Sequence, residues 1–533
     1  MSAKFSKKEL LLIVLVSILP WLPIAFTSFL NDDYQIIGFH TGVNLGTLFK
    51  PFYTTDISGF YWRPLGNFLH VLTLLVFGFS HVAFRIGNLA LYSLCCVQYA
   101  HTSLKMGLNK NAALTSAIIF ALLPAHGFLT GWIAAKGEFL LAIFLLLTVQ
   151  NYYTALKQNS FKNYGYAYLF FCLALLVKEL AFAVMFVPAM FWIANGRNKT
   201  DVKKTVQHTV VAVATILFYL FARYLIVSGT PFTSPHFYNK NIFGYAVNFF
   251  VYCVISFINP EMLSGRYSVI AVLGLVAIIA GVAYCWYANR KEIAKEKYYF
   301  MLGALWFVVF IIPVLPTLMR WYPFTASAGL VWIPAIALSK AFENKKNIRK
   351  IFAIAAILVA AYNFNTMLAW YNAGIKMEGV IKQIKNSNIM HAKDSILVFA
   401  SPDKISNVPF MKLGVEQTFE YALQKKAEVF APLRAELDGK DSHTDLLSAN
   451  DTVVVLNLEK GAFLPEGDRL NGWKKEKEKY ADVDKIKMKI TASKNFQHSR
   501  AEISIDKKYK NYLRVYFDGN RFQIIQPSSN MSF

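Results

Sequence analysis

Charged side chains are scarce in this sequence. Only 16% of its 533 residues are Asp, Glu, Lys or Arg, whereas 55% are hydrophobic and Phe alone occurs 45 times. A soluble globular core does not need so much apolar surface. The composition therefore excludes an ordinary soluble protein and indicates a polytopic membrane protein.

Acidic residues are the rarer of the two charge types, with 32 Asp and Glu against 55 Lys and Arg, which gives a net charge of +23. Such an excess is typical of nucleic-acid binding when the cations line one face. Here they occur in short clusters between apolar runs, which is typical of membrane topology. We therefore expect membrane lipids as partners and no nucleic acid.

Several recognisable motifs are also missing. The sequence has no Walker motif, no dinucleotide-binding fingerprint, no HExxH zinc pair and no internal repeat. The five cysteines, Cys95, Cys96, Cys172, Cys253 and Cys285, all precede residue 373, so a disulfide framework is excluded from the C-terminal region.

Apolar runs of about 20 residues are long enough to cross a bilayer as helices. About eleven are predicted, at residues 9–30, 82–104, 112–128, 134–156, 163–178, 179–195, 205–228, 266–288, 298–317, 322–340 and 349–370. The first lacks a small-residue cleavage site, so we expect an anchor rather than a removed signal peptide. Two other apolar segments, 64–80 and 244–262, are expected to lie in the outer interface.

Lys and Arg cluster in alternate loops, at residues 4–8, 105–110, 157–162, 197–204, 290–297 and 340–350. The positive-inside rule then places the N-terminus in the cytoplasm and the chain after Tyr371 outside. We predict a transmembrane catalytic domain at 1–372, whose first external loop is 31–81. Residues 373–533 are predicted to form an external, periplasmic domain of a protein of the bacterial inner membrane.

The C-terminal region alternates short β-prone runs, "SILVFAS", "DTVVVLNL", "LRVYF" and "RFQII", with a polar stretch at 414–437 that is expected to be helical. The overall fold class is therefore a polytopic α-helical membrane protein with a soluble α/β or α+β domain.

Charged and imidazole side chains collect at the outer ends of the predicted spans. Each costs about 2.5 to 3.5 kcal/mol in lipid, so their convergence indicates a polar cavity. Singly, each has a structural alternative: a polar end to a span, an interfacial anchor, a paired turn or a hydrogen-bonded histidine. They are Asp32, Asp33, Arg63, Arg85, His126, Lys136, Glu138, Lys178, Glu179 and Arg320.

Carboxylates beside several cations suit one reaction in particular. Arg and Lys would bind the phosphate of a polyprenyl carrier, while a carboxylate would deprotonate an acceptor hydroxyl. This combination predicts glycosyl transfer from a lipid-linked sugar. A lipid-linked glycan flippase or exporter and a glycan polymerase or ligase are the alternatives. A flippase is expected to carry charges deep in several spans, and often internal repeats.

An ordered set of motifs resembles a known family. "FLNDDYQIIGF", "YWRPLGNF", "ALLPAHGFLTGWIAAKGEFLLAIF", "LLVKELAF" and "RWYPFTASAG" look like the membrane half of the TMTC-type O-mannosyltransferases and their bacterial relatives, in the GT-C superfamily. Glu138 stands where the family usually has Asp, and Lys136 where it usually has Arg. No tetratricopeptide repeats follow, so the acceptor, a protein hydroxyl or a glycan or lipid, is left open.

The resemblance implies roles for the outer-face residues in an inverting transfer. Asp32 would be the general base, and Asp33 its partner for orientation, acceptor contact or a divalent ion such as Mg or Mn, if one is used. The remaining residues would bind the donor phosphate or shape the cavity: Arg320, Lys178, Arg85 and Lys136, with Arg63, Glu138, Glu179 and His126. The C-terminal domain is expected to select the acceptor without supplying chemistry.

The loop charges generate a topology prediction. A reporter fused after residue 371 should be active only in the external compartment, and one fused near residue 200 only in the cytoplasm. Alkaline phosphatase and fluorescent-protein fusions at the two positions measure this directly. Cytoplasmic activity of the fusion after residue 371 would overturn the predicted orientation.

Overall fold

The fold is known from a computed structural model. It describes residues 4–526 apart from 41, 56–60, 197–201, 228–240, 260–278, 345, 388, 390–394, 406–407, 438–441, 466–477 and 494–496. The chain forms two compact units, each built from two stretches. The first contains residues 1–25 and 42–367, and the second contains residues 26–41 and 368–533. The functional division predicted at residue 373 stays a prediction, because compactness alone does not define a functional domain.

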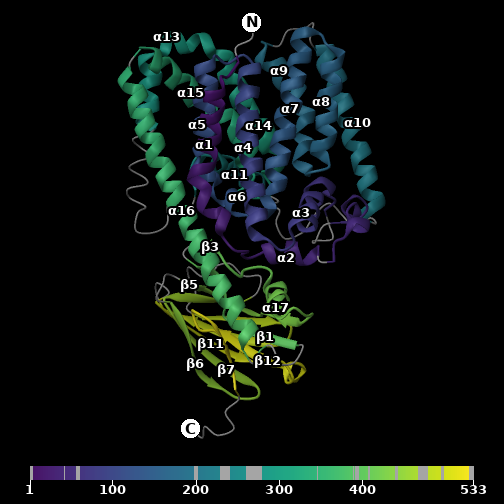
Figure 1. The fold of residues 1–533 in the computed structure, drawn as a ribbon, viewed down its shortest axis with the longest axis vertical. Coiled ribbons are helices and arrows are strands. Elements are labelled where there is room, and N and C mark those ends of the chain that lie inside the picture. Colours follow the sequence, from purple (N-terminus) through teal and green to yellow (C-terminus); the bar gives the residue numbers. More distant parts are fainter. Residues whose placement is uncertain are drawn as a thin grey trace. The chain divides into compact units, whose positions relative to one another are not determined.

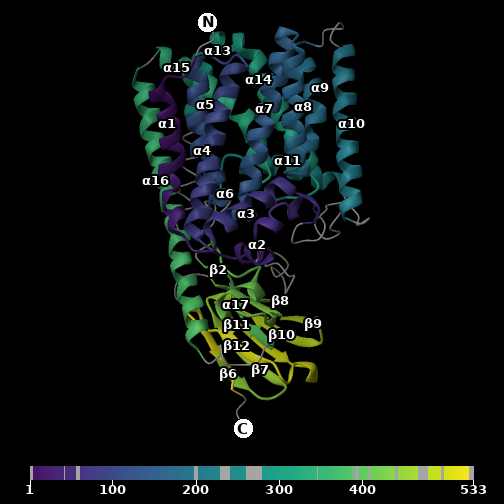
Figure 2. The same cartoon turned by 45° about the vertical axis from the view of Figure 1, so that its right-hand side comes forward.

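The first unit is a bundle of helices (Figures 1 and 2). Its main elements are α1 (Lys7–Ile18) continued by η1 (Leu19–Phe26), α3 (Pro64–Phe77), α4 (His81–Lys105), α5 (Lys110–Leu122), α6 (Gly127–Gly131), α7 (Lys136–Gln158), α8 (Phe161–Leu175), η6 (Glu179–Phe186), α9 (Val187–Ala194), α10 (Val202–Val227), α11 (Ile242–Ile255), α13 (Arg290–Ile293), α14 (Lys297–Ile311), α15 (Pro323–Asn344) and the start of α16 (Lys346–Asn386).

Local sequence explains where several of these helices begin. Ser6 and Glu9 form a capping box at α1, and Asn109 accepts a hydrogen bond from the backbone of α5.

Close packing requires glycine between α14 and α15. A Cβ built on Gly303 would lie 2.5 Å from the carbonyl oxygen of Gly329, so only glycine permits this approach.

Six helices of the described chain are long and apolar enough to cross a membrane, or up to seven if the bent pair 110–122 and 124–131 forms one span. This confirms an integral membrane protein. The predicted count of eleven is not confirmed, because several predicted spans correspond to shorter helices such as α8 and α9. Most of the predicted span 266–288 lies outside the described residues.

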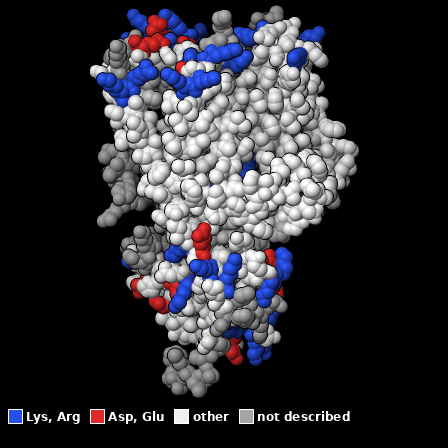
Figure 3. All heavy atoms as spheres, viewed as in Figure 1, with Lys and Arg blue, Asp and Glu red and all other residues white. Residues whose placement is uncertain are grey.

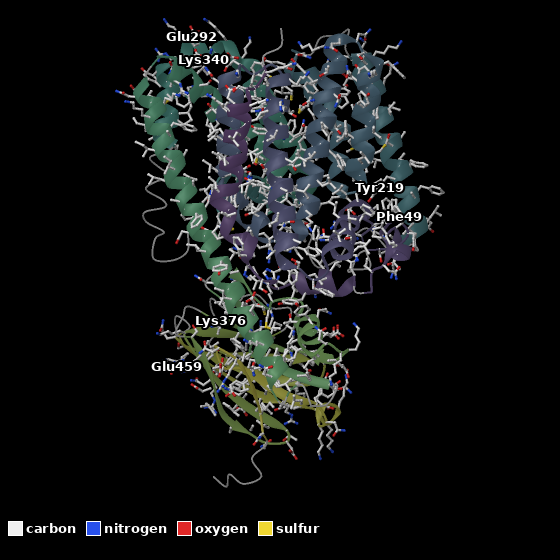
Figure 4. All side chains as sticks on the ribbon, in the orientation of Figure 1. Phe49, Tyr219, Glu292, Lys340, Lys376 and Glu459 are labelled. Atoms are coloured by element: carbon white, nitrogen blue, oxygen red, sulfur yellow. The ribbon has the colours of Figure 1, made fainter. Side chains whose placement is uncertain are left out.

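Charged side chains are unevenly distributed over the surface of the first unit. Its flank is mostly white in Figure 3, and blue Lys and Arg side chains gather at the end that carries α13. Lys340 forms ion pairs with Glu296 and Glu343 there. Figure 4 places Lys340 and Glu292 at this end and Tyr219 toward the opposite end. A cation-rich end beside an apolar flank is the pattern expected of a membrane bundle.

The described residues of the second unit form three sheets, in a strand-rich α+β arrangement that confirms the predicted class. The first has the order β13-β12-β1-β4, with β1 (Ser395–Phe399) parallel to β12 (Leu513–Phe517) and β4 (Glu428–Phe430), and β13 (Phe522–Ile524) antiparallel. The second has the order β6-β7-β11-β10-β9 and is antiparallel throughout, with β6 (His443–Ala449), β7 (Val453–Glu459), β11 (His498–Ser504), β10 (Ile486–Ala492) and β9 (Glu478–Val483). The third joins β3 (Val408–Pro409), β2 (Ser401–Ile405), β5 (Leu433–Leu437) and β8 (Gly461–Pro465).

One prediction for this unit is wrong. The stretch 414–437 was expected to be helical, but helix α17 covers only Val415–Leu423. Gln424 adopts a left-handed conformation, with φ of 54°, which ends the helix. The following residues form β4 and β5, because they pair with β1 and β2 of the neighbouring sheets. Non-local strand pairing outweighs the local helical preference.

Candidate functional site

Two ion pairs meet at one point of the first unit. The Arg63 guanidinium donates to the Glu179 carboxylate through Nε at 3.1 Å and through an Nη at 2.9 Å. The Lys178 ammonium donates to the Glu138 carboxylate. Because Lys178 and Glu179 are neighbours in the chain, the two pairs form one cluster of alternating charge, which we call the ion-pair cluster.

Breaks between helices place these four side chains. Arg63 precedes α3, which begins at Pro64, and Glu138 lies in the first turn of α7. Lys178 has an extended backbone between α8 and η6, with φ of −166° and ψ of 147°. The alternative that Lys178 and Glu179 merely pair with each other across a turn does not hold, since each contacts a different segment.

Two further cationic side chains, Arg85 and Lys136, are buried near the ion-pair cluster. Arg85 is fully buried in α4 and donates to the carbonyl oxygen of Gly131. Lys136 is 2% exposed; its ammonium donates to the Thr73 hydroxyl at 3.0 Å and lies 4.0 Å from the centre of the Phe84 ring. Buried charges are costly unless hydrogen bonds or rings compensate them, so these contacts explain how the cations are held.

Aromatic rings connect Arg320 to the same region. The Arg320 guanidinium lies 3.9 Å from the centre of the Phe128 ring, and Phe128 stacks on Trp321 with ring centroids 5.8 Å apart. Tyr322 contacts the ion-pair cluster, since its ring centre is 4.8 Å from the Lys178 ammonium. The motifs around residues 63, 128, 136, 178 and 320, far apart in the sequence, are therefore brought together.

Sequence reasoning missed several of these partners. Thr73, Phe84, Phe128 and Tyr322 complete the surroundings of the cations but carry no charge that would single them out. Phe128 and Tyr322 do lie inside the quoted motifs "GFLTGWI" and "RWYPF", so their proximity to charged residues was the available signal.

His126 occupies an aromatic cage rather than the ion-pair cluster. It is 1% exposed, its Nδ1 lies 2.9 Å from the Tyr92 hydroxyl, and the Phe324 and Phe120 rings are 4.6 and 4.7 Å away between centroids. These contacts favour the structural interpretation of this histidine over a role in binding the donor.

The ion-pair cluster lies away from the cation-rich end of the first unit. Tyr219 of α10 stacks on Trp62, with centroids 5.5 Å apart, and its hydroxyl donates to the carbonyl oxygen of Trp62 at 3.1 Å. Trp62 precedes Arg63. Figure 4 shows Tyr219 toward the end opposite Glu292 and Lys340, so the cluster is on the side that the sequence predicts to be external.

Asp32 and Asp33 belong to the second unit. The Asp33 carboxylate accepts a hydrogen bond from the backbone N–H of Leu30 at 3.0 Å, and Asp33 is 1% exposed at the start of α2 (Asp33–Phe39). Asp32 is half-buried and accepts from the Asn31 side-chain amide at 3.0 Å. The two carboxylates thus differ in exposure: Asp33 is buried and hydrogen-bonded to the backbone of the turn, whereas Asp32 is the more accessible to solvent.

No metal site emerges from the residues described: no group of three or more His, Cys, Asp or Glu side chains among them could hold an ion.

Comparison with known proteins places this region in a family. Residues 63–224, which include the ion-pair cluster, match the family model described as dolichyl-phosphate-mannose-protein mannosyltransferase. The chain is a membrane glycosyltransferase. The match confirms the enzyme class expected from the ordered motifs. It covers all the predicted site residues except Asp32, Asp33 and Arg320.

The glycosyltransferase also has similar solved structures, although no curated protein matches its sequence. ArnT from Cupriavidus metallidurans in the apo state is 10% identical, with a TM-score of 0.46 over 79% of this chain and 85% of that chain. ArnT from the same organism bound to undecaprenyl phosphate is also 10% identical, with a TM-score of 0.42 over 80% and 86%.

The burial of the ion-pair cluster generates a stability prediction. Glu138→Gln leaves the Lys178 ammonium without its carboxylate partner, and breaking a buried pair costs about 3 to 5 kcal/mol. We expect a clear fall in the melting temperature of the detergent-purified glycosyltransferase. Combining Glu138→Gln with Lys178→Met should restore part of it, since no unpaired charge remains.

The matched control is Glu292→Gln. Glu292 pairs with Lys295 in the same way, but both side chains are at least half exposed. Its replacement should leave the melting temperature unchanged. An equal fall in melting temperature for Glu138→Gln and Glu292→Gln would contradict the burial of the Glu138–Lys178 pair.

Proposed function

We propose that this enzyme transfers a sugar from a polyprenyl-phosphate-linked donor to an acceptor hydroxyl on the outer face of the membrane, with inversion at the anomeric carbon. The observation that carries the proposal is the gathering of Arg63, Arg85, Lys136, Lys178 and Arg320 around one region of an apolar bundle. Cations held in so apolar a medium suit a ligand that is itself an anion on a greasy tail.

The cations have distinct parts in this scheme. Lys178 and Arg320 lie against aromatic rings and would bind the phosphate, while Glu138 and Glu179 keep the cluster close to neutral without a ligand. Arg85 and Lys136 add positive charge from fixed positions, because backbone and hydroxyl oxygens hold them. Preorganised positive charge of this kind stabilises the phosphate as it leaves.

The reaction itself is a single displacement. The acceptor oxygen forms a bond to the anomeric carbon as the bond from that carbon to the phosphate oxygen breaks, and the phosphate leaves with the electron pair. The acceptor proton passes to Asp32, the general base, whose carboxylate is the more accessible of the pair. Asp33 holds the turn through Leu30 and orients its neighbour.

The acceptor is a protein Ser or Thr hydroxyl in this proposal, which the description of the matching family model supports. A hydroxyl of a glycan or lipid would fit the same chemistry, and transfer to a glycan would make the enzyme a polymerase or ligase. The setting is the bacterial inner membrane, with the N-terminus in the cytoplasm, in keeping with the cation-rich end of the helical bundle.

Sugar release separates a transferase from a flippase. The purified enzyme in detergent should release sugar from a polyprenyl-phosphate-linked donor, to water or to an acceptor peptide, without any ion gradient. Chromatography of the freed carrier lipid measures this. Movement of intact donor across vesicles with no cleavage would favour the flippase instead.

Asp32→Asn tests the general base. The amide keeps the size of the side chain but does not take up the acceptor proton, so transfer should fall about 100-fold to 10,000-fold. Donor binding, measured by the thermal shift that the lipid produces, should change little.

The control is Asp482→Asn, the same substitution on an exposed residue of β9. It should transfer at the wild-type rate. Full activity of the purified Asp32→Asn enzyme would remove Asp32 from the reaction.

A further inference from the structure

The segment that carries Asp32 and Asp33 is part of the same compact unit as the C-terminal domain. Residues 26–41 lie near the start of the chain, yet they group with residues 368–533 rather than with the helices that flank them in sequence. Several independent contacts account for this, and all of them lie within the second unit.

Two hydrogen bonds tie the turn before the acidic pair to the loop that leads into α17. The Asn31 backbone N–H donates to the carbonyl oxygen of Phe410 at 2.7 Å. The backbone N–H of Leu413 donates to the side-chain oxygen of Asn31 at 2.8 Å. Asn31 has a φ of 54°, a left-handed conformation that asparagine tolerates, and its amide also donates to Asp32. One residue thus connects the domain to the carboxylate of the proposed base.

Two glycines allow the backbones to approach closely. A Cβ built on Gly414 would lie 2.8 Å from the carbonyl oxygen of Asn31, and Gly414 has a φ of 73°. A Cβ built on Gly374 of α16 would lie 2.8 Å from the backbone nitrogen of Ser28 and 2.9 Å from Thr27 Cγ2. Both positions contact the segment on either side of the turn, so a side chain at either would push the turn away.

Helix α2 completes the attachment. The Tyr34 ring lies 5.3 Å from that of Tyr421 of α17, centroid to centroid, and Tyr34 is 2% exposed. Burial raises the pKa of Tyr34 well above its ordinary value, so the hydroxyl stays neutral. One helical turn later, Gly38 faces Gln417, whose Cβ lies 3.6 Å from a Cβ built on Gly38.

We propose that the C-terminal domain positions the proposed base, by fixing the Asn31 turn through Phe410, Leu413 and Gly414. The inference rests on the proposed function, and it makes the domain part of the catalytic apparatus without giving it a reacting group. A displacement of about 1 Å at a reacting group can cost on the order of 100-fold in rate, so the attachment of this turn matters for catalysis. Asn31 is a positioning residue in this scheme.

The same helix offers a matched pair of substitutions to test this. Gly374→Ala places a methyl group against Thr27 and Ser28, whereas Gly379→Ala meets nothing within 4 Å. Both changes add the same group to α16. We expect Gly374→Ala to lower kcat about 10-fold to 100-fold with the KM for donor lipid unchanged, and Gly379→Ala to behave as wild type. A merely structural defect would lower the amount of folded enzyme, which active-site titration corrects for.

A disulfide tests the attachment directly. Gly38→Cys with Gln417→Cys puts the two Cβ atoms within the range that a disulfide requires. The native cysteines all lie in the first unit, so they offer no competing partner within the second. We expect the pair to oxidise in the folded full-length enzyme, as blocked thiol labelling shows, and the oxidised enzyme to keep its wild-type kcat. Each single cysteine variant is the control.

Four outcomes would overturn the inference. A pair that stays reduced under oxidising conditions would show that the segment is not attached. An oxidised enzyme that is inactive until reduced would show that the domain must release the turn. Equal kcat in the two alanine variants, with active wild type, would show that the attachment has no catalytic effect while the proposed function stands. An inactive wild type whose disulfide forms would instead overturn the proposed function, and the positioning role with it.

Discussion

The structure depends on the cost of placing charge in an apolar medium. A chain with so many hydrophobic residues buries its few charged groups only where each has a counter-charge, a carbonyl or hydroxyl oxygen, or an aromatic face. Arg63 with Glu179 and Lys178 with Glu138 satisfy this requirement in pairs. Arg85 uses the Gly131 carbonyl oxygen, and Lys136 uses Thr73 and the Phe84 ring. The requirement forces helix ends from distant parts of the sequence to meet.

The same requirement links stability to function. A cluster that is nearly neutral without ligand can be buried at a tolerable cost, and in the proposed function its cations bind the donor phosphate. Breaks in the helices supply the geometry, since an extended residue such as Lys178 directs its side chain differently from its neighbours in α8 and η6. Irregular backbone at membrane depth is tolerated only inside protein or beside a polar cavity. The two cations of the ion-pair cluster, Arg63 and Lys178, accordingly lie in such breaks between helices.

The acidic turn follows a different principle. Residues 26–41 are short and form only one helix of seven residues, which has little stability of its own. Hydrogen bonds from Asn31 and the close approach at Gly374 and Gly414 replace that missing local stability. The C-terminal domain thereby becomes one compact unit with a segment that is over 300 residues earlier in the chain, as the bounds of that unit show.

Much of the architecture could be predicted from sequence because its determinants are local. Apolar runs long enough for a bilayer became helices α1, α7, α10, α14 and α15, and "DTVVVLNL" and "LRVYF" became β7 and β12. Charge clusters between the runs marked the cation-rich end. The resemblance to a family was visible in five motifs, since each motif is a continuous stretch of the sequence. Where a local preference met a non-local partner, as in the strands after Gln424, the prediction was wrong.

Only the tertiary structure decided which side chains form ion pairs and hydrogen bonds with one another. The sequence placed Lys178 beside Glu179, but the fold gave Lys178 to Glu138 and Glu179 to Arg63. It placed Asp32 directly after the first span, but the fold attached its turn to Phe410 and Leu413. Charge type, hydropathy and helix length are properties of neighbouring residues, so the sequence alone determined them. Which groups pair depends on how distant segments pack, because a buried charge takes the partner that the packed bundle brings within reach.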